Sequence, residues 1–138
     1  MRRYLIATHG RFAEGIRGAA ELIIGEQENL DTLCCYLTDD FDLETAIQSH
    51  LGRMAAGDEL VVMTDVAGGS VNKGFMLHLN HPGLHLVTGL NLALALTLLS
   101  SDGDEPVEAA IAEAVREAKS GVIYCNSLSG GDGQDDDF

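Results

Sequence analysis

The feature that most constrains the fold is a set of short segments in which nearly every residue is apolar. Residues 4–7 and 60–63 are the clearest of these segments, and neither alternates apolar with polar side chains. A strand of this kind is typical of a parallel sheet that helices cover on both faces. The chain is therefore predicted to form an α/β layer structure around a central sheet.

Segments with helical periodicity separate the expected strands. The expected strands lie at residues 4–7, 33–36, 59–65, 84–88 and 122–125. The expected helices cover residues 12–24, follow the polar cluster 38–40, cover residues 71–79 and 92–99, and begin at Pro106. This alternation predicts a doubly wound three-layer sandwich with a mostly parallel central sheet of about five strands.

The length of 138 residues suits one domain with a buried core. We expect that domain to span residues 1–126. Residues 127–138 are rich in glycine, serine and aspartate, and we expect them to form an acidic, disordered tail.

Composition excludes several classes of protein. Eight basic against 22 acidic residues give a net charge of −14. This charge disfavours nucleic acid and anionic membranes as partners. It would suit a basic protein partner, and solubility explains it equally well. No apolar run approaches the roughly 20 residues that span a bilayer, and the N-terminal apolar segment is too short for a signal peptide. The three cysteines show neither disulfide nor zinc spacing. We therefore expect a cytoplasmic protein without direct membrane insertion.

Three loops that contain glycine follow expected strands, at residues 8–10, 64–70 and 89–91. In parallel sheets, ligands bind beyond the carboxyl ends of the strands, near the point where the strand order reverses. We therefore predict that the three loops converge on one functional site.

His9 is the candidate reactive residue of the first loop. A neutral imidazole can serve as general base, metal ligand or phosphoryl acceptor, and the residue alone leaves these roles open. Asp65, at the end of another expected strand, could accept a hydrogen bond from one ring nitrogen and leave the other free, or could be an N-cap or turn aspartate. His78, His81 and His85 surround a turn with no metal-ligand spacing, so no metal site is expected.

The Gly68-Gly69-Ser70 segment adds backbone amides and a hydroxyl at an expected helix start. Such groups suit a phosphate or phosphoryl oxygen, although flexibility alone is a common reason for paired glycines. Ser70 is also a candidate N-cap. The dinucleotide fingerprint, the P-loop and the Gly-x-Ser-x-Gly elbow are absent, which disfavours the chemistries that they carry.

Three motifs together point to a known family. They are Thr8-His9-Gly10 with Ala13-Glu14-Gly15 after it, the segment 64–72, and Gly89-Leu90-Asn91-Leu92 before an apolar helix. In their order and spacing, residues 1–125 resemble the enzyme IIA domain of the mannose family of the bacterial phosphoenolpyruvate-dependent sugar phosphotransferase system.

This resemblance implies a phosphocarrier that needs no cofactor. His9 would accept a phosphoryl group from phosphorylated HPr and pass it in trans to an enzyme IIB protein, with Asp65 orienting the histidine. Gly68, Gly69, Ser70 and Asn72 would lie beside the phosphohistidine. The resemblance also implies a homodimer in which the C-terminal strand, residues 122–125, is antiparallel or lies at the dimer edge.

The chain departs from the family pattern at Val71, where the family has proline. At a first helical position this change removes preorganisation and no hydrogen bond, so we expect the loop to keep its shape. Two alternatives remain open: the phosphotransfer subunit of dihydroxyacetone kinase, and a regulatory interaction module controlled by phosphorylation. The sequence does not specify the sugar.

Overall fold

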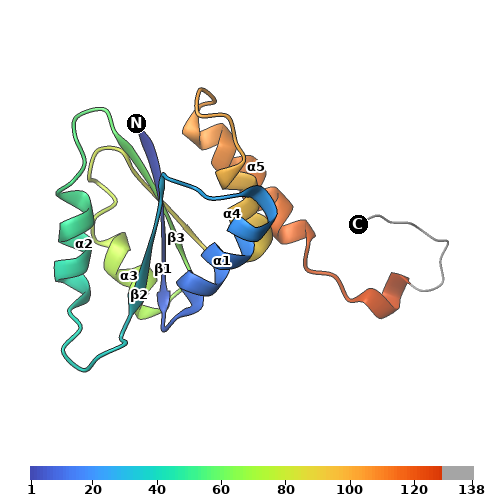
Figure 1. The fold of residues 1–138 in the computed structure, drawn as a ribbon, viewed down its shortest axis with the longest axis horizontal. Coiled ribbons are helices and arrows are strands. Elements are labelled where there is room, and N and C mark those ends of the chain that lie inside the picture. The colour runs from blue at the N-terminus through green and yellow to red at the C-terminus, as the bar shows by residue number, and fades with distance from the viewer. Residues whose placement is uncertain (129–138) are drawn as a thin grey trace.

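A computed structural model describes residues 1–128 as a parallel sheet between two layers of helices (Figure 1). The strands are β1 (Arg2–His9), β2 (Leu30–Cys35), β3 (Glu59–Thr64) and β4 (Leu84–Thr88). The helices are α1 (Phe12–Ile24), α2 (Leu43–Leu51), α3 (Ser70–Met76), α4 (Leu92–Leu99), α5 (Val107–Ser120) and the 3₁₀ helix η1 (Cys125–Leu128). The predicted α/β layer fold is confirmed.

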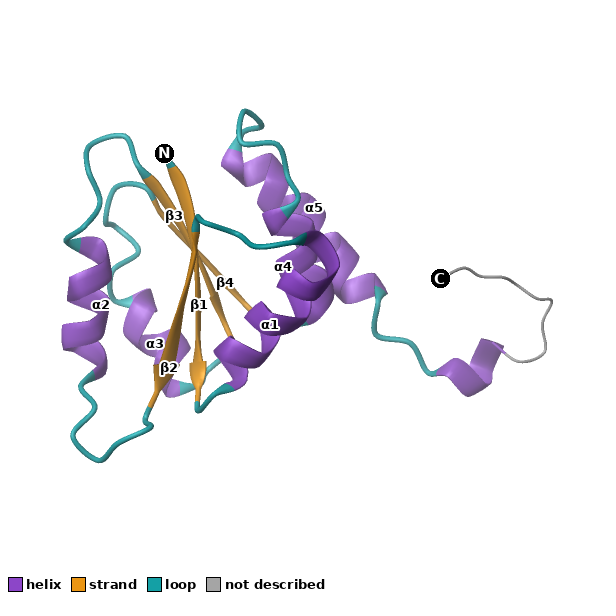
Figure 2. Cartoon of the chain, in the orientation of Figure 1, coloured by secondary structure: helices purple, strands orange, loops and turns teal. Residues whose placement is uncertain are grey.

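The sheet has the order β2-β1-β3-β4, and every pair of neighbours is parallel (Figure 2). The chain leaves β1 to form β2 on one side and then crosses back to form β3 on the other side. The strand order therefore reverses at β1, and the carboxyl ends of β1 and β3 open at this point. Ala7 pairs with Thr64, so the residues that follow them lie at the same edge.

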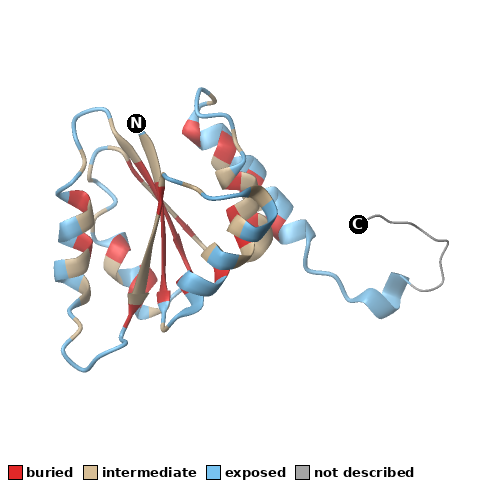
Figure 3. Cartoon of the chain, viewed as in Figure 1, coloured by how far each residue is buried: buried red, intermediate tan, exposed pale blue. Residues whose placement is uncertain are grey.

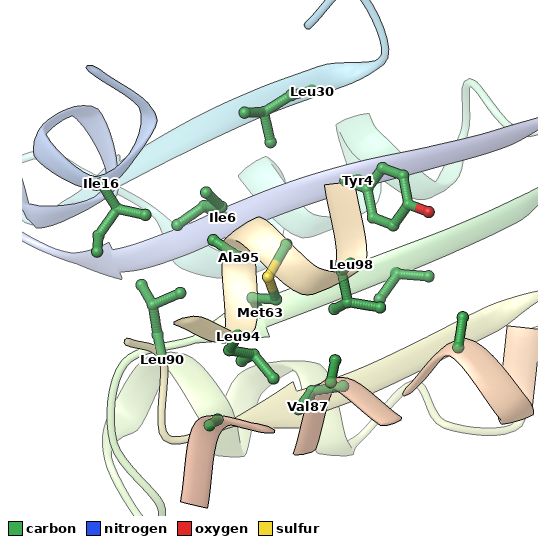
Figure 4. Packing of buried hydrophobic residues seen from close by; sticks show 14 of the residues in the cluster. Tyr4, Ile6, Ile16, Leu30, Met63, Val87, Leu90, Leu94, Ala95 and Leu98 are labelled. Atoms are coloured by element: carbon green, nitrogen blue, oxygen red, sulfur yellow. The ribbon is translucent and has the colours of Figure 1, made fainter. Parts of the chain in front are cut away.

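Side chains of the central strands point alternately to two cores. Ile6 and Met63 belong to the core beneath α1, α4 and α5, together with Leu94 (Figure 4). Leu5 and Val62 belong to the second core, beneath α2 and α3. Because both faces are covered, the middle of β1 and β3 is buried throughout (Figure 3). This burial explains the continuous apolar segments of the sequence.

The strand expected at residues 122–125 does not form. Residues 122–124 leave the end of α5 without regular structure, and Cys125 begins η1 (Figure 1). Among the described residues the sheet therefore has four strands instead of about five. A strand requires a neighbouring edge for its backbone hydrogen bonds, and this segment extends away from the sheet of its own chain.

None of the helices within residues 1–128 is long and apolar enough to cross a bilayer. Of the acidic tail expected at residues 127–138, the part from residue 129 onward lies outside the described residues.

Candidate active site

His9 lies at the carboxyl end of β1, where the strand turns into α1. Gly10 makes this turn with φ +58°, a conformation that favours glycine, and its amide donates to the carbonyl of Cys35 at 2.9 Å. The buried hydroxyl of Thr8 accepts from the amide of Ala13 at 2.8 Å and so fixes the start of α1. The turn leaves the His9 side chain 46% exposed.

Asp65, the residue after β3, holds the His9 ring through a carboxylate oxygen. Its Oδ2 accepts from the His9 backbone amide and contacts ring Nδ1, each at 2.8 Å, while Oδ1 accepts from the amide of Val66 at 3.0 Å. An ionised carboxylate can only accept, so Nδ1 carries the proton and Nε2 of the neutral ring keeps its lone pair. The arrangement therefore leaves Nε2 available as a nucleophile.

The environment favours the ionised form of Asp65. Burial alone would raise the pKa of this carboxyl, but the backbone amide of His9, its ring N–H and its charge together hold the pKa below the ordinary value. The residue therefore acts as a hydrogen-bond acceptor at neutral pH.

The depressed pKa predicts a pH-dependent stability difference between the wild type and Asp65→Asn. Because the folded-state pKa lies below the unfolded value, the stabilisation is complete above the unfolded pKa, about 4, and is lost as the pH falls through the folded value. Urea unfolding in a series from about pH 6 to about pH 2.5 should show the two free energies converging on acidification. A constant difference across the series would contradict this account of Asp65.

Ser70, the first residue of α3, faces the other side of the ring. Its Oγ lies 3.3 Å from His9 Nε2. The N-cap of α3 is Gly69, which makes no side-chain cap, so the expected capping role of Ser70 is wrong. Instead of capping the helix, the hydroxyl is directed into the site.

The two glycines before Ser70 allow the loop to approach the ring. Gly68 has φ +79°. A Cβ on Gly69 would lie 2.9 Å from a methyl group of Val66 and 3.5 Å from His9 Cε1. A side chain at this position would therefore crowd the turn at Val66 and would touch the imidazole at an ordinary contact distance.

Asn72 lies near the site in sequence, but its side chain is used inside the protein. It is buried; its Oδ1 accepts from the Thr64 hydroxyl at 2.9 Å, and its Nδ2 lies 3.6 Å from the sulfur of Met76. These contacts fasten α3 to the end of β3. Asn72 therefore supports the loop from beneath, in place of the predicted position beside the reactive ring.

The third predicted loop reaches the same edge through its backbone. The amide of Leu90 donates to the carbonyl of Thr64 at 3.1 Å, and Asn91 caps α4 by accepting from the amide of Leu94 at 2.8 Å. The side chain of Asn91 also donates to the carbonyl of Ala118. This loop therefore braces β3, while the groups that contact His9 come from elsewhere.

Tyr36 is a site residue that the sequence reasoning did not single out. Its ring centroid lies 5.4 Å from that of His9, and its hydroxyl donates to Ser70 Oγ at 2.9 Å. A usable signal was present, because Tyr36 directly follows β2 and so reaches the same edge as His9.

Three other histidines make contacts that do not involve His9 or its neighbours in the site. His78 Nε2 contacts Glu44, His50 Nδ1 contacts Arg53, and His81 Nδ1 contacts the carbonyl of Pro82. No group of three or more His, Cys, Asp or Glu side chains within residues 1–128 could hold a metal ion.

Fold and site together define an α/β domain that presents a carboxylate-tethered histidine to solvent at the switch point of its sheet. Residues 3–119 match the sequence model of the family described as the PTS system fructose IIA component, and the chain belongs to this family. The predicted resemblance to mannose-family enzyme IIA is thereby confirmed.

Individual relatives agree with this family. The chain is 28% identical over 127 residues to the mannose-specific EIIAB component of Escherichia coli K12. The matched region covers 86% of this chain but only 38% of that protein. A structure from Klebsiella pneumoniae, assigned to the permeases of the sugar phosphotransferase system, shares 42% identity with a TM-score of 0.88, covering 92% of this chain and 93% of that one. The mannose/sorbose specific IIA subunit from Enterococcus faecalis shares 25% identity with a TM-score of 0.78, covering 88% and 92%.

Proposed function

We propose that the chain is a phosphohistidine carrier in sugar uptake. His9 Nε2 accepts a phosphoryl group from phosphorylated HPr and passes it in trans to an enzyme IIB protein in the cytoplasm. The observation that carries the proposal is the tether of Nδ1 to Asp65 at 2.8 Å, which leaves Nε2 of a half-exposed ring free to attack.

The proposed transfer exchanges one phosphorus–nitrogen bond for another. The bond from phosphorus to the HPr imidazole breaks as the bond to His9 Nε2 forms, and the Nδ1 proton stays on the hydrogen bond to Asp65. The positive charge that develops on the His9 ring is then balanced by a carboxylate that is already in place. Positioning and electrostatics therefore account for the chemistry without a cofactor.

The loop after Asp65 would receive the phosphoryl oxygens. The amides in the first turn of α3 have no acceptors within the helix, and the Ser70 hydroxyl lies beside Nε2. Gly68 makes the turn at φ +79°, and Gly69 places no side chain against the ring. In this proposal Asn72 holds the loop in place through Thr64 and does not touch the phosphoryl group.

Labelling of the wild-type chain tests the function. Incubation with phosphoenolpyruvate, enzyme I and HPr should add a single phosphoryl group, detected by intact mass and mapped to His9 by peptide sequencing at alkaline pH. Transfer onward to a IIB protein should regenerate the unmodified mass. Failure to label, or label mapped to another histidine, would overturn the proposal.

We further propose that residues 1–126 act as one domain and pair with a second copy through residues 122–125. The apolar side chains of Val122, Ile123 and Tyr124 are exposed. Strand β4 ends the sheet on one side, and within residues 1–128 the buried hydroxyl of Thr88 on this strand has no hydrogen-bond partner. The exposed apolar segment 122–125 of one copy can therefore pair with the open β4 edge of a second copy.

Ile123→Asp is expected to convert the dimer to a monomer, because a charge would have to be buried against the partner's sheet edge. Sedimentation velocity across a dilution series should show the change in mass. Leu22→Asp is the matched control, since Leu22 is 89% exposed on α1. A monomeric wild type would refute the proposed dimer and leave the carrier function untouched.

A further inference from the structure

Tyr36 combines an unusual backbone with a position at the site. It follows β2 directly and has φ +66°, a left-handed conformation that is uncommon for a bulky residue. This conformation ends the strand and turns the side chain along the sheet edge toward His9.

Two neighbours fix the tyrosine ring in this position. The ring packs against His9 with a centroid distance of 5.4 Å and an interplanar angle of 36°. Phe41 meets it edge to face at 5.2 Å. The aromatic ring of Tyr36 is therefore held between the reactive imidazole and a second aromatic ring.

The directions of the hydrogen bonds follow from the tether at Asp65. With the ring proton on Nδ1, Nε2 can only accept, so the single proton of Ser70 points at Nε2 across 3.3 Å. Ser70 Oγ must then be the acceptor in its bond with Tyr36, whose hydroxyl donates across 2.9 Å. A directed chain of donors runs from Tyr36 through Ser70 to His9.

We propose that Tyr36 is a positioning residue for phosphoryl transfer and that it acts through Ser70. The inference rests on the proposed carrier function of His9. The bond from Tyr36 holds Ser70 Oγ in place and polarises its O–H, since linked hydrogen bonds strengthen one another. When phosphorus approaches Nε2, the Ser70 proton turns from the ring nitrogen to a phosphoryl oxygen, while the oxygen itself stays where Tyr36 holds it.

The first experiment probes the chain of donors without any phosphoryl donor. The ¹⁵N chemical shift of His9 Nε2 reports the hydrogen bond that this atom accepts. Tyr36→Phe keeps the ring and removes the hydroxyl, and it should move the shift in the same direction as Ser70→Ala but by less. In a Ser70→Ala background, Tyr36→Phe should produce no further change. An unchanged shift in Tyr36→Phe alone would overturn the proposal.

The second experiment is a double-mutant cycle on the rate of phosphoryl uptake from phosphorylated HPr. Tyr36→Phe should slow the single-turnover rate about fivefold, the usual effect of losing one neutral hydrogen bond. It should have no effect when Ser70 is already alanine. Additive losses in the two backgrounds would show that Tyr36 does not act through Ser70 and would overturn the proposal.

Tyr4→Phe is the matched control. It also removes a tyrosine hydroxyl within reach of a serine, here Ser101 Oγ at 3.4 Å. Tyr4 begins the stretch of β1 that pairs with β2, and His9 ends it. Its uptake rate should equal that of the wild type. If the wild type itself takes up no phosphoryl group, the carrier function fails, while the nitrogen shift still decides the role of Tyr36.

Discussion

His9→Ala is expected to abolish phosphoryl uptake from phosphorylated HPr. The substitution removes the nitrogen that forms the new bond, and no neighbouring group can replace it. Both carboxylate oxygens of the adjacent Asp65 already accept from backbone amides, and the Ser70 hydroxyl has no general base other than the deleted ring. Intact mass after incubation with the phosphoryl donors should show no added group.

The fold should survive this change, because the His9 side chain is half exposed and lies outside both cores. Circular dichroism and thermal unfolding of His9→Ala should match those of the wild type. The control is His81→Ala, which removes another partly exposed imidazole, in the turn before β4. Equal labelling of His9→Ala and the wild type would show that the acceptor had been misassigned.

Asp65→Ala is expected to slow phosphoryl uptake about 100-fold. The ring loses the group that fixes its tautomer and the charge that balances its own. Hydrogen bonds to charged groups contribute about 1.5–3 kcal/mol each, which accounts for a change of this size. Asp65→Asn should be milder, at about tenfold. Both carboxylate oxygens accept from backbone amides, and Oδ2 also serves His9 Nδ1.

The geometry therefore decides how an asparagine would be oriented. At the Oδ1 position its NH₂ group would face one donor, the backbone amide of Val66. At the Oδ2 position it would face two donors, the backbone amide and the ring Nδ1–H of His9. The carbonyl oxygen would then remain on His9, and the correct tautomer would be kept. Single-turnover rates measure both variants, with Asp102→Asn as a remote control. If asparagine proved as damaging as alanine, or worse, the tautomer would not be held in this way.

Much of the fold could be predicted because its determinants are local. Strands buried on both faces produce continuous apolar segments, and amphipathic helices produce a regular period, so α1 and β4 were placed with their observed bounds. The meeting of His9 with Asp65 followed from topology, since His9 ends β1 and Asp65 directly follows the neighbouring parallel strand β3.

What could not be predicted depends on side-chain direction or on partners outside the segment. Residues 122–125 have strand-like composition, but residues 122–124 form no regular structure and Cys125 begins η1. Ser70 and Asn72 lie two positions apart on α3, so the rotation of the helix points them in different directions. The Ser70 hydroxyl faces the His9 ring, and the Asn72 side chain contacts Thr64. The position of Tyr36 directly after β2 places it at the edge of the site, but the direction of its side chain depends on a left-handed backbone that the sequence does not show.

The parallel sheet order affects how the site around His9 assembles during folding. His9 and Asp65 are 56 residues apart, and Ser70 follows 61 residues after His9, so the groups around the imidazole come from the ends of β1 and β3 and the start of α3. The entropy of closing the long loops between these groups must be overcome before their contacts form, and small domains fold cooperatively. Phosphoryl uptake during refolding should therefore appear in one step together with native structure, which makes the chemistry of His9 a reporter of complete assembly.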